Sequence, residues 1–481
     1  MRKRAARGVL MRMRVLSWVG GALLAAGFGP ASPSAAQDRD AFLQQQRRLD
    51  EQVRADRNLD RSSADRAFLD YGGWYSFHLF LFDDGIEPSR TFRRHDLRVW
   101  TRLQLDEGAH ELYLRGRLSF LDFNAGDSYD GDDDDVEGMN LERGTYRFDL
   151  ARAAGVYGWT APEVNVIVRA GRDLVEIGTG LTLSTPLDHV DIRLETADWR
   201  LRGLVGRTVG STQDIDLTRP ADRTRRAFFG AELSYTAPQR HEPFVYVLWQ
   251  RDHNRETYPT PLQEFDYDSF YIGAGSTGEL APRFMYRAEW AYESGRSFGD
   301  RAFMRSDVIR AWGANAQLEY QFPGDRRVRA TLEYLFGSGD ADRQLSPTDA
   351  IGGNVRGNED TGFNAWGYRD TGLSFAPRYS NVHLWRAGAA WYPWPRDPRL
   401  DGVEVGLDAL LYHKHHRSGA VSDPTAARTS GYLGSEVDAY VNWAITRDVS
   451  WTARVGVFFP GDAFDDRTAR PFFLTGVTWS F

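Results

Sequence analysis

Arginine and carboxylate residues stand at every second position in many segments of the chain, with apolar residues between them. In the segment 92–105, for example, Asp96 and Arg98 alternate with Leu97 and Val99. Arginine has a planar fork of donors and a permanent charge, which suit it to bidentate binding of carboxylates, and nearby acids keep such binding weak enough for release. An equally simple interpretation is that arginine–carboxylate ladders stabilise an interior. The candidate residues for a polar path are Arg98, Arg102, Arg115, Arg117, Arg169, Arg193, Arg200, Arg202, Arg287, Arg329, Arg386, Arg454, Asp96, Glu195, Glu289, Glu333 and Asp408.

The elements that must position these residues are β-strands, because side chains alternate between the two faces of a strand. The last ten residues, FFLTGVTWSF (472–481), show the pattern most clearly, with Val477, Trp479 and Phe481 on one face. A lipid-exposed sheet cannot leave an edge open, so we expect this strand to pair with the first one, 71–82, and close a barrel. An aromatic terminus on such a strand resembles the signal that the barrel insertion machinery recognises in outer-membrane proteins.

The segment between these two strands contains similar alternating stretches, about eighteen strands in all, as in large outer-membrane barrels. The predicted strands are 71–82, 92–105, 109–121, 145–158, 163–173, 188–195, 198–208, 225–236, 243–252, 268–278, 283–294, 308–321, 327–337, 382–392, 402–413, 433–445, 449–459 and 472–481.

The connections between the predicted strands alternate in length, which favours a transmembrane antiparallel β-barrel over a soluble sandwich. Barrels of the outer membrane have short periplasmic turns and long extracellular loops. The expected fold class is therefore all-β, located in the outer membrane. The expected long loops are 122–144, 174–187, 209–224, 295–307, 338–381, 414–432 and 460–471.

Composition agrees with a barrel and excludes several other classes. The mean hydropathy of −0.51 leaves no room for a bundle of apolar helices, whereas a barrel needs an apolar residue at only every second position. Cysteine is absent, so disulfides, cysteine–zinc sites and thiol nucleophiles are excluded.

The N-terminus resembles a secretory signal peptide over residues 1–36, with six basic residues, an apolar stretch and a small-residue cleavage site. Its removal leaves 53 basic residues against 67 acidic ones, a net charge of −14, which argues against a nucleic-acid partner. Residues 37–70 are polar, and we expect a periplasmic arm that is helical or disordered. The barrel would then occupy 71–481.

Two motifs suggest other chemistry, but weakly. The acidic run DSYDGDDDDVEG (127–138) could bind calcium, although it lacks the ligand spacing of an EF-hand, and HKHH (413–416) could bind a transition metal. A solvated loop and adventitious binding are the simpler interpretations. No Ser/His/Asp constellation is apparent. We therefore expect no catalytic residue, metal or cofactor.

The chain resembles the alginate export family of outer-membrane proteins. The resemblance rests on GRD at 171–173, LEYLFGSGD at 332–340 and the Asp-, Gly- and aromatic-rich insertion 338–381, and it covers essentially all of 71–481. It implies a barrel of about eighteen strands with an arginine-lined conduit for an anionic polysaccharide. The aromatic residues of the insertion could narrow the mouth of the barrel.

The main hypothesis is an outer-membrane channel that conducts an anionic, uronate-containing polysaccharide or oligosaccharide outward, without chemistry. Its partners would be that sugar, outer-membrane lipid and, in the periplasm, export proteins. The alternatives are a general or uptake porin for acidic oligosaccharides or small solutes, a barrel enzyme acting on lipid or glycan, and a soluble carbohydrate-binding β-protein.

Overall fold

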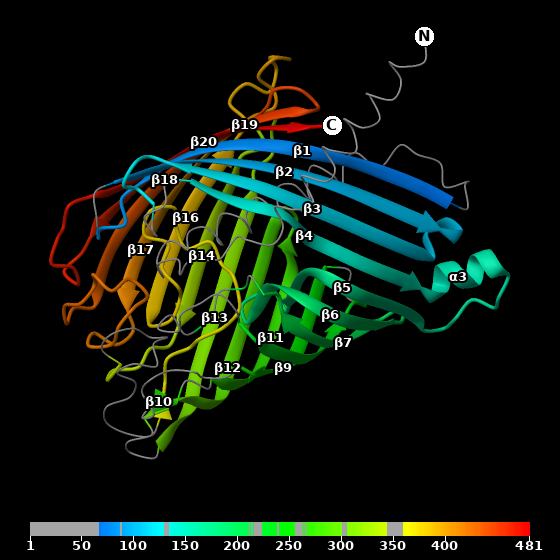
Figure 1. Ribbon diagram of the computed structural model, residues 1–481, viewed down its shortest axis with the longest axis horizontal. Helices are drawn as coiled ribbons and strands as arrows, with labels where there is room; N and C mark the ends of the chain where they lie inside the picture. Colours follow the sequence, from blue (N-terminus) through cyan, green and yellow to red (C-terminus); the bar gives the residue numbers. More distant parts are fainter. Residues whose placement is uncertain are drawn as a thin grey trace, which may run out of the picture.

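The computed structural model shows one closed antiparallel barrel (Figure 1). The structure describes residues 67–86, 89–128, 134–210, 212, 215, 224–237, 240–254, 263–264, 267–300, 305–343 and 359–481. The predicted signal peptide 1–36 and almost all of the predicted arm 37–70 lie outside these residues.

Eighteen long strands form the wall, and two strands of two residues each, β10 (Gln263–Glu264) and β15 (Glu359–Asp360), extend it locally. The long strands are β1 (Ala67–Phe82), β2 (Arg90–Leu105), β3 (His110–Phe123), β4 (Asp134–Asp149), β5 (Asn165–Ile177), β6 (Leu183–Glu195), β7 (Trp199–Thr208), β8 (Arg226–Tyr235), β9 (His241–Asp252), β11 (Asp268–Ala281), β12 (Phe284–Asp300), β13 (Arg305–Gln321), β14 (Arg329–Gly337), β16 (Val382–Trp391), β17 (Val403–Lys414), β18 (Tyr432–Ala444), β19 (Val449–Pro460) and β20 (Arg470–Ser480).

The barrel closes between its first and last strands, as predicted. β1 pairs antiparallel with β20 from Trp74 opposite Ser480 to Phe82 opposite Phe472. Beyond the last strand, the backbone of Phe481 exchanges two hydrogen bonds with Gly73. The seam therefore leaves no free edge along β20.

The lengths of most connections alternate, but three predicted long loops are wrong. The predicted loop 122–144 is mostly strand, because β4 begins at Asp134 and the β3–β4 connection contains only 124–133. The β5–β6 connection contains only 178–182, and the β12–β13 connection only 301–304. The predicted loops 174–187 and 295–307 are mostly strand. The strands β5, β6, β12 and β13 extend beyond the residues in which polar and apolar side chains alternate regularly.

The predicted strand 145–158 is also wrong. β4 ends at Asp149, and the helix α3 (Leu150–Tyr157) follows it at the end of the barrel that carries the short turns (Figure 1). The Asp149 side chain accepts a hydrogen bond from the Arg152 amide, and Gly158 ends the helix in the left-handed conformation. The helix rests on the one-turn helix η3 (Asp106–Gly108), where the Tyr157 hydroxyl donates to Asp106.

The outer face of the barrel is an apolar belt bordered by aromatic residues. Side chains such as Val190, Ile192 and Leu194 alternate along β6 and are 46%, 44% and 37% exposed. Exposed Trp199 and Trp479 lie at the end with the short turns, and exposed aromatic residues also lie near the loop end of several strands. This arrangement is that of a wall immersed in lipid. In the described part of the chain, no helix has the length and apolarity needed to cross a bilayer.

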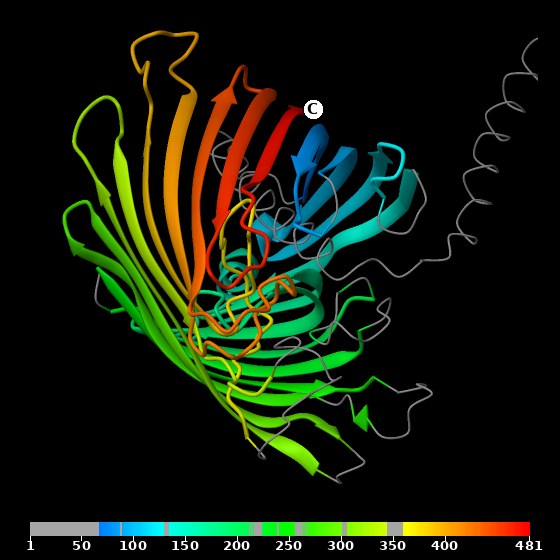
Figure 2. The ribbon, with the colours of Figure 1, turned by 90° about the vertical axis from the view of Figure 1, so that its left-hand side faces the viewer.

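The described parts of the insertion between β14 and β16, 338–343 and 359–381, lie inside the ring of strands (Figure 2). Its aromatic residues Phe363, Trp366, Phe375 and Tyr379 are buried in one cluster with inward-facing side chains of β5–β9, β11–β14 and β16–β19. The insertion is therefore a packed part of the interior rather than a free loop.

Candidate functional site

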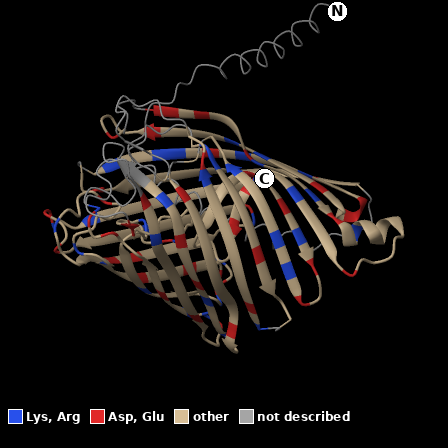
Figure 3. Ribbon diagram, turned by 90° about the horizontal axis from the view of Figure 1, so that it is seen from below, with Lys and Arg blue, Asp and Glu red and all other residues tan. Residues whose placement is uncertain are grey.

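Inward-facing arginines concentrate on one side of the barrel, on strands β2–β7. Figure 3 shows basic and acidic residues interleaved along the strands. We define the arginine wall as Arg94, Arg98, Arg102, Arg115, Arg117, Arg143, Arg169, Arg193, Arg200 and Arg202. Strict alternation explains the side that most of them face, because the residues between them are the exposed apolar ones of the outer belt.

On β2–β4, the arginine wall is a buried network around two carboxylates. Asp96 forms ion pairs with Arg94 and Arg98, with N–O distances of 2.9 Å and 3.5 Å. Glu142 lies 3.1 Å from Arg98 and 2.7 Å from Arg115. The indole of Trp74 contacts both Arg98 and Arg115, whose guanidinium carbons are 5.6 Å and 5.5 Å from the ring centre. These charged side chains are almost fully buried, so each ion pair holds its partners in position and connects the strands that carry them.

On β4–β7, the arginine wall repeats the same motif with more exposed arginines. Asp173 lies 2.6 Å from Arg143 and 3.6 Å from Arg169. Asp191 lies 3.0 Å from Arg193 and also pairs with Arg202. Each of these carboxylates is nearly buried, whereas Arg143, Arg169 and Arg193 have side chains that are 21%, 33% and 30% exposed.

The ten arginines of the arginine wall outnumber the eight described carboxylates that pair with them. Arg102 pairs with Asp70, Arg117 with Glu137, and Arg200 with Glu195 and Glu242. Four bridging carboxylates, Asp96, Glu142, Asp173 and Asp191, are shared by seven arginines, Arg94, Arg98, Arg115, Arg143, Arg169, Arg193 and Arg202. The partly exposed arginines present donors to the lumen while the acids behind them hold their positions. Such an array can bind an anion without a fixed, tight pocket.

The opposite side of the lumen uses its carboxylates differently, because they hold the insertion. Glu436 of β18 accepts hydrogen bonds from the amides of Leu373, Ser374 and Phe375 at 2.7, 2.6 and 2.9 Å. Glu293 of β12 accepts from the amide of Asn364 at 2.9 Å. Buried carboxyl groups are costly unless they are hydrogen-bonded, and here their partners are backbone amides of the insertion, so these acids fasten the insertion to the wall.

The insertion also crosses to the β5–β6 connection. Trp366 forms a parallel bridge with Leu183. The Trp366 amide donates to the carbonyl of Thr182 at 3.0 Å, and the Ser184 amide donates to the carbonyl of Trp366 at 2.8 Å. The Tyr379 hydroxyl donates to the carbonyl of Leu181 at 2.6 Å. The described insertion thus runs from the β11–β13 wall past β6 to β18, and it narrows the lumen opposite the arginine wall.

The predicted site residues on the later strands are dispersed rather than gathered. Arg386 lies 3.3 Å from the carboxylate of Asp370 in the insertion and 3.5 Å from Glu333, so it also holds the insertion. Glu289 accepts from the amide of Thr179 at 2.7 Å and so holds the β5–β6 connection.

The remaining predicted residues lie nearer the end with the short turns. Arg329 pairs with Glu404, and the guanidinium of Arg454 lies 5.8 Å from the Tyr440 ring centre. The half-buried Arg287, Asp408 and Glu195 lie on β12, β17 and β6, where Glu195 is 3.4 Å from Arg200.

Sequence reasoning missed Glu142 and Arg143, which the prediction placed in a loop. A bulge explains the miss: Arg115 pairs with Arg143 and Gly116 with Leu141, so Glu142 is an extra residue on β4. The extra residue lets consecutive side chains both reach the lumen, which strict alternation cannot indicate. Trp74 was missed because the candidate set contained only charged residues.

Neither metal motif gains support. In the described segments, no group of three or more histidine or acidic residues is arranged to hold a metal ion. HKHH lies at the end of β17, where Lys414 donates to the carbonyl of Ala426 at 2.8 Å. Part of the acidic run, 129–133, lies outside the described residues, and its end belongs to β4.

The closed wall, the apolar outer belt and the charged lumen together define an outer-membrane channel of the large-barrel class. The chain belongs to the alginate export family, whose model matches residues 186–472. This confirms the predicted family resemblance. No curated protein matches the sequence.

Solved structures show the same fold at low sequence identity. Pseudomonas aeruginosa OccK11 (OpdR) is 12% identical, with a TM-score of 0.51 over 88% of this chain and 99% of that one. Pseudomonas aeruginosa OccK2 (OpdF) is also 12% identical, with a TM-score of 0.51 over 86% of this chain and 98% of that one. At this identity the likeness supports the barrel architecture and no more.

Proposed function

We propose that the channel conducts an anionic, uronate-containing polysaccharide or oligosaccharide along the arginine wall. The observation that carries the proposal is the sharing of four carboxylates by seven arginines on one side of the lumen. The family's description as alginate exporters supports the choice of sugar and the outward direction. Periplasmic export partners belong to the same proposal.

The geometry suggests how a polyanion could move without being trapped. A uronate carboxylate can take one or two donors from Arg169 or Arg193, while Asp173 and Asp191 compete for the same guanidinium groups. An ion pair at about 4 Å contributes about 1 kcal/mol in water and more where water is partly excluded. Several weak, equivalent sites let the chain advance by exchange from one arginine to the next.

Planar-bilayer recordings test the proposal. The wild-type channel should be anion-selective and should be blocked by uronate oligomers, with block that strengthens as the oligomer lengthens. The double variant Arg169→Gln/Arg193→Gln should bind the blocking uronate oligomers about 25-fold more weakly, because each arginine contributes about fivefold. Arg93→Gln, on the outer face beside Asp122, is the matched control and should leave block unchanged. Cation selectivity, or a pore insensitive to uronates, would contradict the proposal.

A second candidate function is uptake of small acidic solutes, and the insertion favours it because it narrows the lumen opposite the arginine wall. Liposome flux separates the two: a solute channel should pass uronate monomers quickly and exclude oligomers. Export can be tested in the native cell by deleting the gene, after which the acidic polymer should accumulate in the periplasm instead of the medium.

A further inference from the structure

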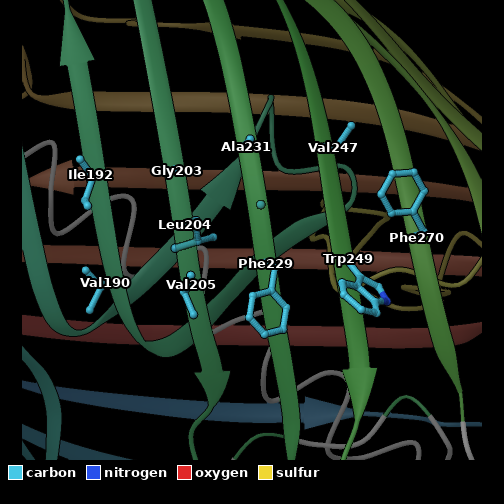
Figure 4. Close-up of a pocket in the computed structure, with 11 residues that line it drawn as sticks. Val190, Ile192, Gly203, Leu204, Val205, Phe229, Ala231, Val247, Trp249 and Phe270 are labelled. Carbon is cyan, nitrogen blue, oxygen red and sulfur yellow. The ribbon is translucent and has the colours of Figure 1, made fainter.

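A groove lies on the outer, lipid-facing surface of β6–β11, away from the lumen (Figure 4). Its volume is about 490 Å³. The cause is a cross-strand row in which Ile192 pairs with Gly203, Gly203 with Ala231, and Ala231 with Val247. Two neighbouring positions of this row lack large side chains, so the belt is hollowed there.

Large apolar side chains border the hollow. The adjacent cross-strand row pairs Val190 with Val205, Val205 with Phe229, and Phe229 with Trp249. Neighbouring strands lie about 4.8 Å apart, so a groove that reaches from β6 to β11 is about 19 Å across. One acyl chain, which spans half of a hydrocarbon core about 30 Å thick, can lie in such a groove by leaning across the tilted strands.

The next row towards the loops is charged. On the outer face, Arg172 pairs across the strands with Asp188, Asp188 with Arg207, and Ala227 with Arg251. The guanidinium of Arg172 binds Asp188 at 2.7 Å, whereas the side chain of Arg207 is 77% exposed and lies 3.8 Å from that carboxylate. The guanidinium of Arg251 lies over the Trp249 ring, 5.0 Å from its centre.

Continued to β12, this row also holds Asp268, which pairs with Arg296, so four arginines face two carboxylates along β5–β12 and leave an excess of positive charge above the groove. Two residues along a strand correspond to about 6.6 Å, so this charge lies at the edge of the apolar belt. The row is at the loop end of the strands, and long loops face the cell exterior. An outer-leaflet lipid places its phosphates at this depth and its acyl chains below them.

We propose that this face binds one phosphorylated lipid of the outer leaflet, with an acyl chain in the groove and a phosphate on Arg207 and Arg251. The site is separate from the conducting lumen, because both arginines and both small residues face outward. It would fix the orientation and depth of the β6–β9 wall in the membrane. Arginine's fork suits it to a phosphate oxygen pair.

Native mass spectrometry of the detergent-purified full-length protein tests the site, with bisphosphorylated lipid A and its dephosphorylated form as probes. The wild-type protein should bind one bisphosphorylated molecule and prefer it to the dephosphorylated one. Arg207→Gln with Arg251→Gln should weaken binding about 25-fold, at about fivefold per arginine near the membrane surface. Arg310→Gln is the matched control, because Arg310 lies at the loop end of β13 and is paired with Glu359 at 2.6 Å.

Filling the groove provides a second, independent variant. A Cβ at Gly203 would meet no heavy atom within 4 Å, so Gly203→Leu with Ala231→Leu should fold normally and bind both probes less well. Heat-dependent gel mobility and single-channel conductance confirm an intact barrel. Equal binding of both probes by the wild type, or unchanged binding by both double variants, would overturn the proposal. A wild-type dimer that disappears in the filled variant would instead assign the groove to a second copy of the chain.

Discussion

The strongest single attachment of the insertion is predicted to be Glu436. Its carboxylate is fully buried and accepts the amides of Leu373, Ser374 and Phe375, and the Tyr412 hydroxyl is 3.2 Å away. Glu436→Gln keeps one acceptor oxygen and replaces the other with a donor. One amide then loses its partner, and the remaining bonds lose the charge that strengthened them.

The magnitude follows from the number of bonds. A hydrogen bond to a charged group contributes about 1.5–3 kcal/mol and a neutral one about 0.5–1.5 kcal/mol. Losing one bond and weakening the others should lower the free energy of local opening by about 3 kcal/mol, roughly 150-fold in the opening equilibrium.

Hydrogen exchange measures this equilibrium directly, because amides in a local opening exchange at a rate set by its free energy. The amides of 373–375 should exchange roughly 150-fold faster in Glu436→Gln, and the single-channel current should show more frequent openings to a wider state. Glu404→Gln is the control, since Glu404 of β17 pairs with Arg329 of β14, across β16, and does not contact the amides of 373–375. Wild-type exchange at 373–375 in an intact Glu436→Gln barrel would refute the assignment.

Three further perturbations test the packing of the insertion. Burial, together with two neighbouring histidine rings, lowers the pKa of His415 to about 4, and its Nδ1 accepts a hydrogen bond from the amide of Gly339 at 3.1 Å. When the insertion is detached, the exposed ring titrates near 6.5. The packed insertion should therefore lose stability as the pH falls from about 6.5 to about 4, with no further loss below that. Current fluctuations should increase over that window in the wild type, and their persistence in His415→Gln would contradict this. Phe375→Ala, which removes a buried ring from an aromatic stack, should lower the free energy of opening by about 3–5 kcal/mol, measured by exchange in the insertion. A Cβ on Gly367 would overlap the carbonyl oxygen of Leu181, so Gly367→Ala should displace the insertion and speed hydrogen exchange in the β5–β6 connection. An unchanged exchange rate would contradict the close contact between the two segments.

The fold could be predicted from the sequence wherever alternation is unbroken. Residues 472–481 and 71–82 each show the period of two, and closure between them follows from the cost of an open edge in lipid. Alternation fails at α3, where a pattern that fits a strand continues into a helix capped by Asp149. It also fails at Glu142, where the bulge reverses the facing of β4.

The site could be predicted in part. The arginine wall follows from parity, because Arg98, Arg115 and Arg193 lie on regular strands. The sharing of one carboxylate between two arginines depends on which strands are neighbours, and single-strand patterns do not contain that information. The role of Glu436 could not be predicted either, because its partners are backbone amides of a distant irregular segment.

The attachments of the insertion have a consequence for the order of assembly. Tyr379 and Leu181 are separated by 198 positions in the chain, and Ser374 donates to the carbonyl of Arg470, 96 positions later. Such contacts have a high loop-closure entropy until the strands that carry both partners are already side by side. We expect the ring to close around an open bore first, and the insertion to settle into it afterwards. Newly inserted barrels would then pass through a wide, leaky stage, and a periplasmic factor that occupied the bore during this stage would protect the cell.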